Sequence, residues 1–445
     1  MIKREGASSL MLGEMMRKKG YKNNFSTIKI IAACMVVIAH SYPLSGVTGE
    51  PLAVVTKGRL GLGDLAVQLF FSISGFLITC SVFRMFQKKS YKSLKKCVIG
   101  FFKRRFLRLF PSLLIVNFIV FFIVVPIFST GNRLGYFLRA DPYVNFMKTS
   151  FLFIVYRVPH LWVNNPLATE VNGSLWTLPI EFICYIALFL GIIFGFIGKI
   201  CYHNHYLEDS YKGVRSRNSR SFLRPVKDLT NGKIFGTERY ILLKLCQDMF
   251  VSRLKIAYRK TACQSSKQFA IRQIVNRFLE KFGMLFMFSL FLFQPCLLSS
   301  GTISFLHSWI LELCLIYYFS SLYYVYREKI VLNWKLFIII FVICVVLYCF
   351  NFGVYTIVFL PYLVFYLAYA VPQFSFLNRL GKYSYECYLV AFPIQQGLVF
   401  LEGGGHPWKI TFLTLPLMFL AAVGISQIKD RLLLCKCLKG LLTYD

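Results

Sequence analysis

Apolar blocks of about 20 residues recur along the chain and alternate with short connections rich in Lys, Arg, Gly or Asn. A transmembrane helix needs about 20 consecutive apolar residues, so each block is long enough to cross a bilayer. The pattern predicts an all-α polytopic membrane protein, a bundle of about ten transmembrane helices. The predicted spans lie near 25–45, 64–84, 109–128, 174–197, 282–300, 303–325, 333–350, 355–372, 384–401 and 410–428.

The basic residues of the connections orient these spans. With the N-terminus in the cytosol, the predicted inner loops contain KRRFLR (103–108), YREK (326–329) and NRLGK (378–382), whereas the outer connections are less basic. Cytoplasmic loops of membrane proteins carry an excess of Lys and Arg. The charge pattern therefore predicts that both termini are cytosolic.

Two longer regions interrupt the spans. The outer loop 130–173 contains NFMKTSFLFIVY, for which a re-entrant segment is one interpretation. The basic insert contains RYILLKLCQDMFVSRLKIAYRK, which suits either a helix on an anionic inner leaflet or a solvated loop. The predicted regions are a basic cytosolic N-terminal segment (1–24), a first transmembrane half (25–199), the cytosolic insert (200–281), a second transmembrane half (282–428) and a cytosolic tail (429–445).

The amino-acid composition disfavours several classes of protein. Hydrophobic residues make up 57% of the chain and charged residues 16%, which fits a membrane protein and not a soluble one. The net charge of +32 comes from Lys and Arg beside the spans, so we expect no nucleic-acid partner. The 14 cysteines lack paired spacing, so we expect neither a disulfide framework nor a metal. The sequence has no phosphate-binding glycine loop, which disfavours ATP-driven transport.

Two ionisable residues share one face of the first span. Lys29 and His40 are eleven residues apart, almost three helical turns, which places them about 16 Å apart along the helix. A cation near the inner end and an imidazole near the outer end suit a ligand that threads the membrane. Alternatively, Lys29 reaches lipid headgroups and His40 bonds a neighbouring carbonyl.

Glu181 lies inside the span that follows the sequence TEVNGSLWTLPIE. An intramembrane carboxylate is costly unless it is paired or faces a polar cavity, so a functional role is the default interpretation. Glu181 lies about two turns below the outer end of its span and His40 about one turn below its own, so contact is geometrically possible. A carboxylate beside His40 would orient it as a general base.

Other polar residues in the spans allow two interpretations. Arg105 and Arg108 are spaced to share a helix face at the inner side, where they either clamp phosphate oxygens or only signal topology. Glu312 has no obvious partner and stays unassigned. In the second span, small residues predict close helix packing, namely Ser72, Ser74, Gly75 and Thr79.

The motifs together resemble the acyltransferase family 3 membrane proteins, bacterial enzymes that O-acetylate cell-surface glycans and some small molecules. The resemblance covers about 25–195 and 282–428. The motifs that carry it are, in order, Lys29-x10-His40, LAVQLFFSISGFLIT, RRFLRLFP, NGSLWTLPIEF and LGKYSYECYLVAFPIQQ.

The resemblance implies a donor, acetyl-CoA, that enters from the cytosol. It implies that Lys29, Arg105 and Arg108 hold the CoA phosphates. His40 would act as general base on an acceptor hydroxyl, with Glu181 orienting it, and an acetyl-histidine relay is an equal variant. The outer mouth would be shaped by Asn172, Ser174 and Trp176.

This chain departs from the family pattern in places. Lys29 stands where members usually carry an arginine, and Ser41 where many carry an acid. The late motif reads Gly381 to Glu386, GKYSYE, where members commonly have GDYSYG. Typical members lack the insert 200–281. Glu181 is therefore the expected carboxylate partner of His40.

The expected acceptor is a hydroxyl of a surface polysaccharide, either lipopolysaccharide O-antigen, capsule or exopolysaccharide, or a lipid-linked glycan. The expected location is the bacterial inner (cytoplasmic) membrane. Two rival interpretations remain: a transporter or flippase of a lipid-linked glycan without acyl-transfer chemistry, and a scaffold that recruits partners through its basic insert.

Overall fold

The computed structural model describes residues 10–20, 22–87, 94–130, 132–191, 301–349 and 356–434. The insert 200–281, the predicted span 282–300 and most of the tail 429–445 lie outside these ranges. The chain divides into two compact units, residues 1–83, 99–186 and 291–445 in the first, and 84–98 and 187–290 in the second. Every candidate site residue belongs to the first unit.

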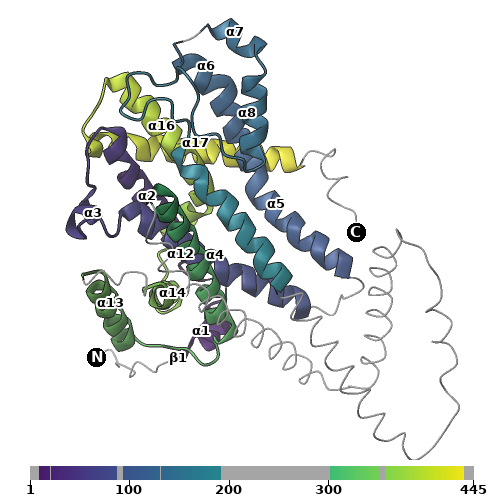
Figure 1. The fold of residues 1–445 in the computed structure, drawn as a ribbon. Helices are drawn as coiled ribbons and strands as arrows, with labels where there is room; N and C mark the ends of the chain where they lie inside the picture. The colour runs from purple at the N-terminus through teal and green to yellow at the C-terminus, as the bar shows by residue number, and fades with distance from the viewer. Residues whose placement is uncertain are drawn as a thin grey trace, which may run out of the picture. The chain divides into compact units, whose positions relative to one another are not determined.

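The structure is almost entirely helical (Figure 1). Apart from 282–300, every predicted apolar block coincides with a helix wherever it is described. The elements are β1 (Leu10–Met11), α1 (Leu12–Lys19), α2 (Phe25–Leu44), α3 (Pro51–Val55), α4 (Leu62–Gln87), α5 (Leu94–Ile119), the π-helical η1 (Val120–Val124), α6 (Val125–Phe128), α7 (Arg133–Leu138), α8 (Asp141–Ser150), the 3-10 helix η2 (Gly173–Trp176), a helix at 177–191, α12 (Gly301–Val325), β2 (Val331–Leu332), α13 (Trp334–Cys349), α14 (Thr356–Tyr369), α15 (Ser375–Leu380), η5 (Gly381–Tyr383), α16 (Ser384–Glu402) and α17 (Pro407–Leu434).

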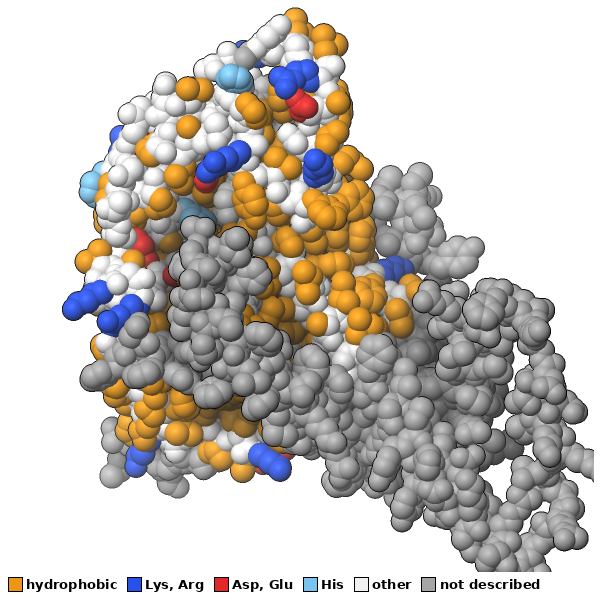
Figure 2. Space-filling model, viewed as in Figure 1, with side chains coloured by type: hydrophobic (Ala, Val, Ile, Leu, Met, Phe, Trp, Pro, Cys, Tyr) orange, Lys and Arg blue, Asp and Glu red, His pale blue; other side chains and the backbone are white. Residues whose placement is uncertain are grey.

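Among the described residues, five helical segments are long and apolar enough to cross a membrane: Phe25–Leu44, Leu62–Met85, Val98–Phe128, Gly173–Gly191 and Pro407–Leu434. Shorter apolar helices lie at Trp309–Val325, Trp334–Cys349 and Thr356–Tyr369. Large apolar side chains remain exposed along several helices, for example Ile339 and Phe341 on α13 and Leu420 on α17. Figure 2 shows such side chains spread over the face in view. An exposed apolar surface of this extent fits lipid, which confirms a multi-pass helical membrane protein.

Helix α2 lies at the centre of the arrangement that positions the site. It packs against α16 and α17, and the three helices share one buried apolar core with part of α5 (Figure 1). The start of α2 is held by Asn24, whose Nδ2 donates to the carbonyl oxygens of Leu367, Val371 and Pro372 at 3.0–3.3 Å. Asn24 is only 2% exposed, so this anchor is buried. It holds the turn of α2 that carries Lys29.

The predicted close packing of the second span is confirmed at Gly75. A Cβ atom at this position would lie 2.2 Å from the backbone oxygen of Tyr317, so α4 and α12 approach at a distance that only glycine permits. Two serines of α12 bond across the same contact: Ser320 Oγ donates to Ser72 Oγ at 3.0 Å and Ser321 Oγ to the Gly75 oxygen at 3.3 Å. Glu312, unassigned from sequence, accepts a hydrogen bond from Gln68 Nε2 at 2.7 Å.

The acidic end of the late motif is buried in an ion pair. Glu386 on α16 lies 2.5 Å from Lys429 Nζ on α17 and accepts a hydrogen bond from Ser112 Oγ on α5 at 2.8 Å. The Glu386 side chain is 3% exposed and that of Lys429 19%. Glu386, which stands where the similar family commonly has glycine, is therefore paired with a cation of the same chain, Lys429.

The predicted outer loop 130–173 contains α7 and α8. Two isolated β-bridges pair Ser129 with Leu161 and Arg157 with Glu170. Trp162 is 1% exposed, and its ring packs against that of Phe128. Helix α8 ends at Ser150, within the segment for which a re-entrant piece was one interpretation. The re-entrant path stays a prediction.

Replacing Gly75 with alanine should force α4 and α12 apart, because the new methyl group meets backbone rather than a movable side chain. We expect a destabilisation of about 1–3 kcal/mol. The thermal midpoint of the detergent-purified protein measures it. Gly424→Ala in α17 is the matched control, because nothing lies within 4 Å of its Cβ position. An equal midpoint for Gly75→Ala and the control would contradict the close approach.

Removing Lys429 alone should leave the Glu386 carboxylate buried without its cation. Breaking one side of a buried pair costs about 3–5 kcal/mol, whereas removing both charges is often close to neutral. We therefore expect Lys429→Met to lower the thermal midpoint and Glu386→Gln combined with Lys429→Met to restore most of it. A double variant as unstable as the single one would show that the pair is not the cause.

Candidate functional site

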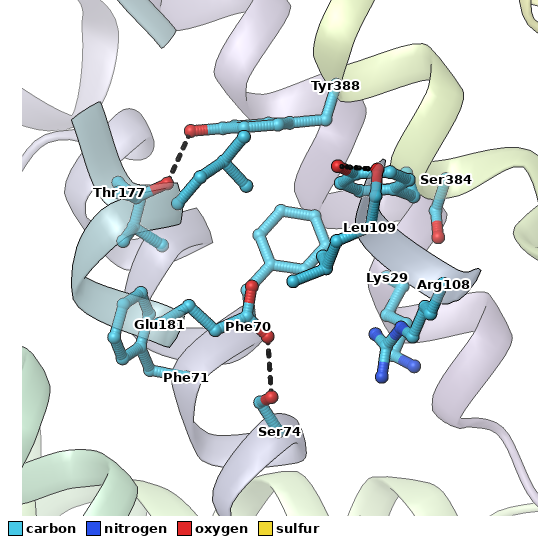
Figure 3. A pocket seen from close by; sticks show the side chains of 13 residues that line it. Lys29, Phe70, Phe71, Ser74, Arg108, Leu109, Thr177, Glu181, Ser384 and Tyr388 are labelled. Carbon is cyan, nitrogen blue, oxygen red and sulfur yellow. Dashed lines mark hydrogen bonds between the residues drawn. The ribbon is translucent and has the colours of Figure 1, made fainter. Parts of the chain in front are cut away.

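A small cavity in the first unit lies between α2, α4, α5, α16 and the 177–191 helix (Figure 3). Its volume is about 50 Å³. Figure 3 shows Lys29 and Arg108 together at one end, and Glu181 pointing toward Ser74. Three segments that are distant in sequence, α2, α5 and the 177–191 helix, thus bring three predicted site residues into one cavity.

The Glu181 carboxylate accepts two hydrogen bonds at Oε1. Ser74 Oγ donates from α4 at 2.6 Å, and Tyr185 Oη donates from the next turn of the same helix. These two hydrogen bonds fix the position of the carboxylate. Sequence reasoning did not assign Ser74 or Tyr185 to the site, although Tyr185 follows Glu181 at the i, i+4 spacing that places two side chains on one helix face.

Two cations, Lys29 and Arg108, lie within electrostatic range of this carboxylate. Arg105 lies within electrostatic range of both of these cations. Arg105 also places its guanidinium 5.4 Å from the ring centre of Phe101 and 5.8 Å from that of Tyr185. Three positive groups beside one negative group leave a formal excess of two positive charges.

Within the part of the chain that the structure describes, these cations make no hydrogen bond or ion pair. The Nε atom of Arg105 is buried and has no hydrogen-bond partner there. Buried charged donors are costly when they are unpaired, so the cluster has the properties of an anion-binding site. Phosphate oxygens are the ligands that arginine forks bind best.

His40 lies away from this cluster. Its Nδ1 atom is 3.5 Å from Ser174 Oγ, and its ring meets Phe392 edge-on with ring centres 5.3 Å apart. Among the described residues, no hydrogen bond or ion pair joins His40 to Glu181. The two side chains have different hydrogen-bond partners, and the role of Glu181 in orienting His40 stays a prediction.

The separation of the two side chains has a simple geometric cause. The span was expected to start at its outer end with residue 174, but Ser174 is 1% exposed and already lies beside His40. Glu181 follows Ser174 by seven residues of 3-10 and α-helix, about 12 Å further along the span. This distance brings Glu181 to the level of the Lys29 end of α2.

Asn172 and Trp176, which were predicted to shape the outer mouth, differ in how deeply they are buried. Asn172 is buried: its Nδ2 donates to the Leu389 carbonyl at 2.8 Å, and its Oδ1 accepts from the Ser174 backbone N–H at 3.2 Å. Trp176 is half-buried, and its ring meets Trp309 of α12 at 6.4 Å between centres. Asn172 thus caps η2 and ties it to α16, while Trp176 keeps part of its ring accessible.

Tyr388 of α16 links the cavity to the histidine. Its ring lines the cavity, and its hydroxyl bonds Thr177 Oγ1 at 2.8 Å and donates to the Ser174 carbonyl oxygen. The candidate site therefore has two adjacent parts on one face of α2, the cationic cavity around Lys29 and the His40–Ser174 pair, with Tyr388 between them.

Comparison with known proteins agrees with the motifs. Residues 23–220 match the family model of an acyltransferase domain, acyltransferase family 3. This part of the chain is therefore similar to the acyltransferase family 3 domain. The matched range includes Lys29, His40, both site arginines and Glu181, whereas Tyr388 lies beyond it.

Two curated relatives match part of the chain. The "O-acetyl transferase" of Shigella phage Sf6 is 34% identical over 165 residues, which are 37% of this chain and 44% of the relative. "Nodulation protein 10" of Rhizobium leguminosarum bv. viciae is 30% identical over 174 residues, 38% of this chain and 44% of the relative. The chain spans less than half the length of these relatives. No solved structure matches the chain.

Replacing Glu181 with glutamine should tighten the binding of an anion to the cation cluster, because it removes a negative charge from beside that site. Coulombic repulsion across a few ångströms in a partly buried site corresponds to about a 3- to 30-fold gain in CoA affinity. The shift of the thermal midpoint with CoA concentration measures it. Glu312→Gln, which changes an intramembrane carboxylate bonded to Gln68, should leave the affinity unchanged. Unchanged CoA binding by Glu181→Gln, with transfer lost, would instead support the role of orienting His40.

Proposed function

We propose that the protein is a membrane O-acetyltransferase that moves an acetyl group from cytosolic acetyl-CoA to a hydroxyl of a surface polysaccharide. The observation that carries the proposal is the cation cluster with unpaired donors, three helical turns along α2 from His40. The name of the phage relative, an O-acetyl transferase, supports the reaction class. The acceptor is lipopolysaccharide O-antigen, capsule or exopolysaccharide, or a lipid-linked precursor of one.

The proposed topology has ten spans and cytosolic termini, in the inner membrane of a bacterium. Contacts between predicted inner segments support it. Strand β1 pairs with β2, and Arg17 of α1 lies 2.9 Å from Glu328 in the YREK loop. Asn378, in the NRLGK loop, donates from Nδ2 to the Asn23 carbonyl at 2.8 Å. The N-terminal segment and two predicted cytosolic loops therefore meet on one side, the side from which Lys29 would meet the donor.

Acetyl-CoA enters this proposal as the substrate that the cation cluster binds. Lys29, Arg105 and Arg108 would hold its phosphates, since their donors have no partner among the described residues. The pantetheine arm would rise from the cavity along α2 toward His40. In this scheme Glu181 balances the cations rather than acting on His40.

His40 would supply the chemistry as a general base. It takes the proton of the acceptor hydroxyl while the oxygen attacks the thioester carbonyl; the C–S bond then breaks, and the CoA thiolate takes the proton from the imidazolium. A relay through acetyl-histidine uses the same residue as the nucleophile. Trp176 offers a flat aromatic face to a sugar ring at the outer side.

Replacing His40 with alanine should lower acetyl transfer by about 10²- to 10⁴-fold, the usual worth of a general base. The measurement is incorporation of labelled acetyl groups from acetyl-CoA in membranes that contain the acceptor, at matched expression. His406→Ala is the matched control, because His406 is an exposed residue that only accepts from the Trp408 backbone N–H at 3.4 Å.

Two outcomes would contradict the proposal. Full transfer by His40→Ala would mean that another group is the base. No transfer by the native chain, together with movement of an unmodified lipid-linked glycan across the membrane, would favour the transporter interpretation. Mass spectrometry of surface glycan from cells with and without the gene identifies the acceptor through the acetyl group that is lost.

A further inference from the structure

We propose that Ser174 is the positioning residue of His40: its hydroxyl oxygen accepts the Nδ1 proton of the imidazole and leaves Nε2 free to act as the base. The inference rests on the proposed function, since it concerns the base of that reaction. It assigns to a neutral hydroxyl the task that sequence reasoning gave to the Glu181 carboxylate.

The contact itself is the first step of the argument. Ser174 Oγ lies 3.5 Å from His40 Nδ1, and it is the polar side-chain atom that reaches this imidazole among the described residues. A neutral imidazole has one protonated and one unprotonated nitrogen, and the hydrogen bond at one nitrogen decides the state of the other. A proton held at Nδ1 by Ser174 puts the basic lone pair on Nε2. Catalytic hydrogen bonds are often long before substrate binds, so 3.5 Å is compatible with this role.

The second step is the rigidity of Ser174. Its backbone N–H donates to Asn172 Oδ1 at 3.2 Å, and its carbonyl oxygen accepts from Tyr388 Oη. Asn172 in turn donates to the Leu389 carbonyl on α16. These contacts give its hydroxyl a fixed position relative to α16.

The third step is the confinement of the imidazole. Phe392, one turn beyond Tyr388 on α16, meets the His40 ring at an angle of 83°. The same ring closes over Gly173, where a Cβ atom would lie 2.9 Å from Phe392 Cε2. Phe392 of α16 therefore contacts both η2 and the His40 ring. The imidazole lies between the Phe392 ring and the Ser174 hydroxyl.

The test replaces Ser174 with alanine and measures acetyl transfer by the full-length protein in membranes. Loss of orientation should cost part of what the base contributes, about a 10- to 100-fold fall in kcat, with KM for acetyl-CoA unchanged within about twofold. Ser320→Ala is the matched control: it also removes a buried serine hydroxyl bonded to another side chain, but at the contact of α12 with Ser72. The control should keep the native kcat, and both variants should have equal thermal midpoints.

A double variant separates positioning from a structural role. If Ser174 acts through His40, Ser174→Ala should cause no further loss of transfer when His40 is already alanine. A full kcat for Ser174→Ala, or an equal loss in both backgrounds, would overturn the inference. Labelled acetyl found covalently on Ser174 after incubation with acetyl-CoA alone would also overturn it, because Ser174 would then be the nucleophile. Absence of transfer in the native chain would refute the proposed function instead.

Discussion

Positive charge held inside an apolar bundle is the constraint on which the site depends. Lys29, Arg105 and Arg108 come from two helices, and Lys29 and Arg108 lie near the Glu181 carboxylate. The hydrogen bonds of Glu181 itself come from Ser74 and Tyr185. Burial of unpaired charge is unfavourable, so the rest of the fold has to hold these groups together. The Asn24 anchor fixes the start of α2, which carries Lys29, and the Gly75 contact with α12 fixes α4, which carries Ser74.

In the proposed function, the chemistry takes place further along the same helix. Because α2 carries both Lys29 and His40, it fixes their separation along the helix axis at about 16 Å. The proposal assigns this separation to the charged end of the donor and the base. Helix α16 closes the arrangement by bonding Ser174 and Asn172 and by lining the cavity with Tyr388. The late motif thus contributes packing and hydrogen bonds to a site whose charged groups come from the first half of the chain.

Much of this could be predicted from the sequence. Block length predicted the helices, small residues predicted the packing at Gly75, and the spacing of basic residues singled out the cations now found together. The partner of His40 could not be predicted, because the depth of Glu181 depends on where η2 enters the bundle. The roles of Ser74 and Tyr388 depend on contacts between helices that are distant in sequence. The hydrophobic pattern predicts where the spans lie in the sequence, but not which residues of neighbouring spans lie at the same depth in the bundle.

The central claim is that the cation cluster binds the phosphates of a CoA donor. The most direct measurement compares the affinity of the purified protein for CoA, dephospho-CoA and pantetheine by titration. The account predicts clear binding of CoA, weaker binding of dephospho-CoA and little binding of pantetheine, with the CoA preference lost when Arg108 is changed to glutamine. Equal affinity for CoA and pantetheine, or a preference that survives Arg108→Gln, would contradict it.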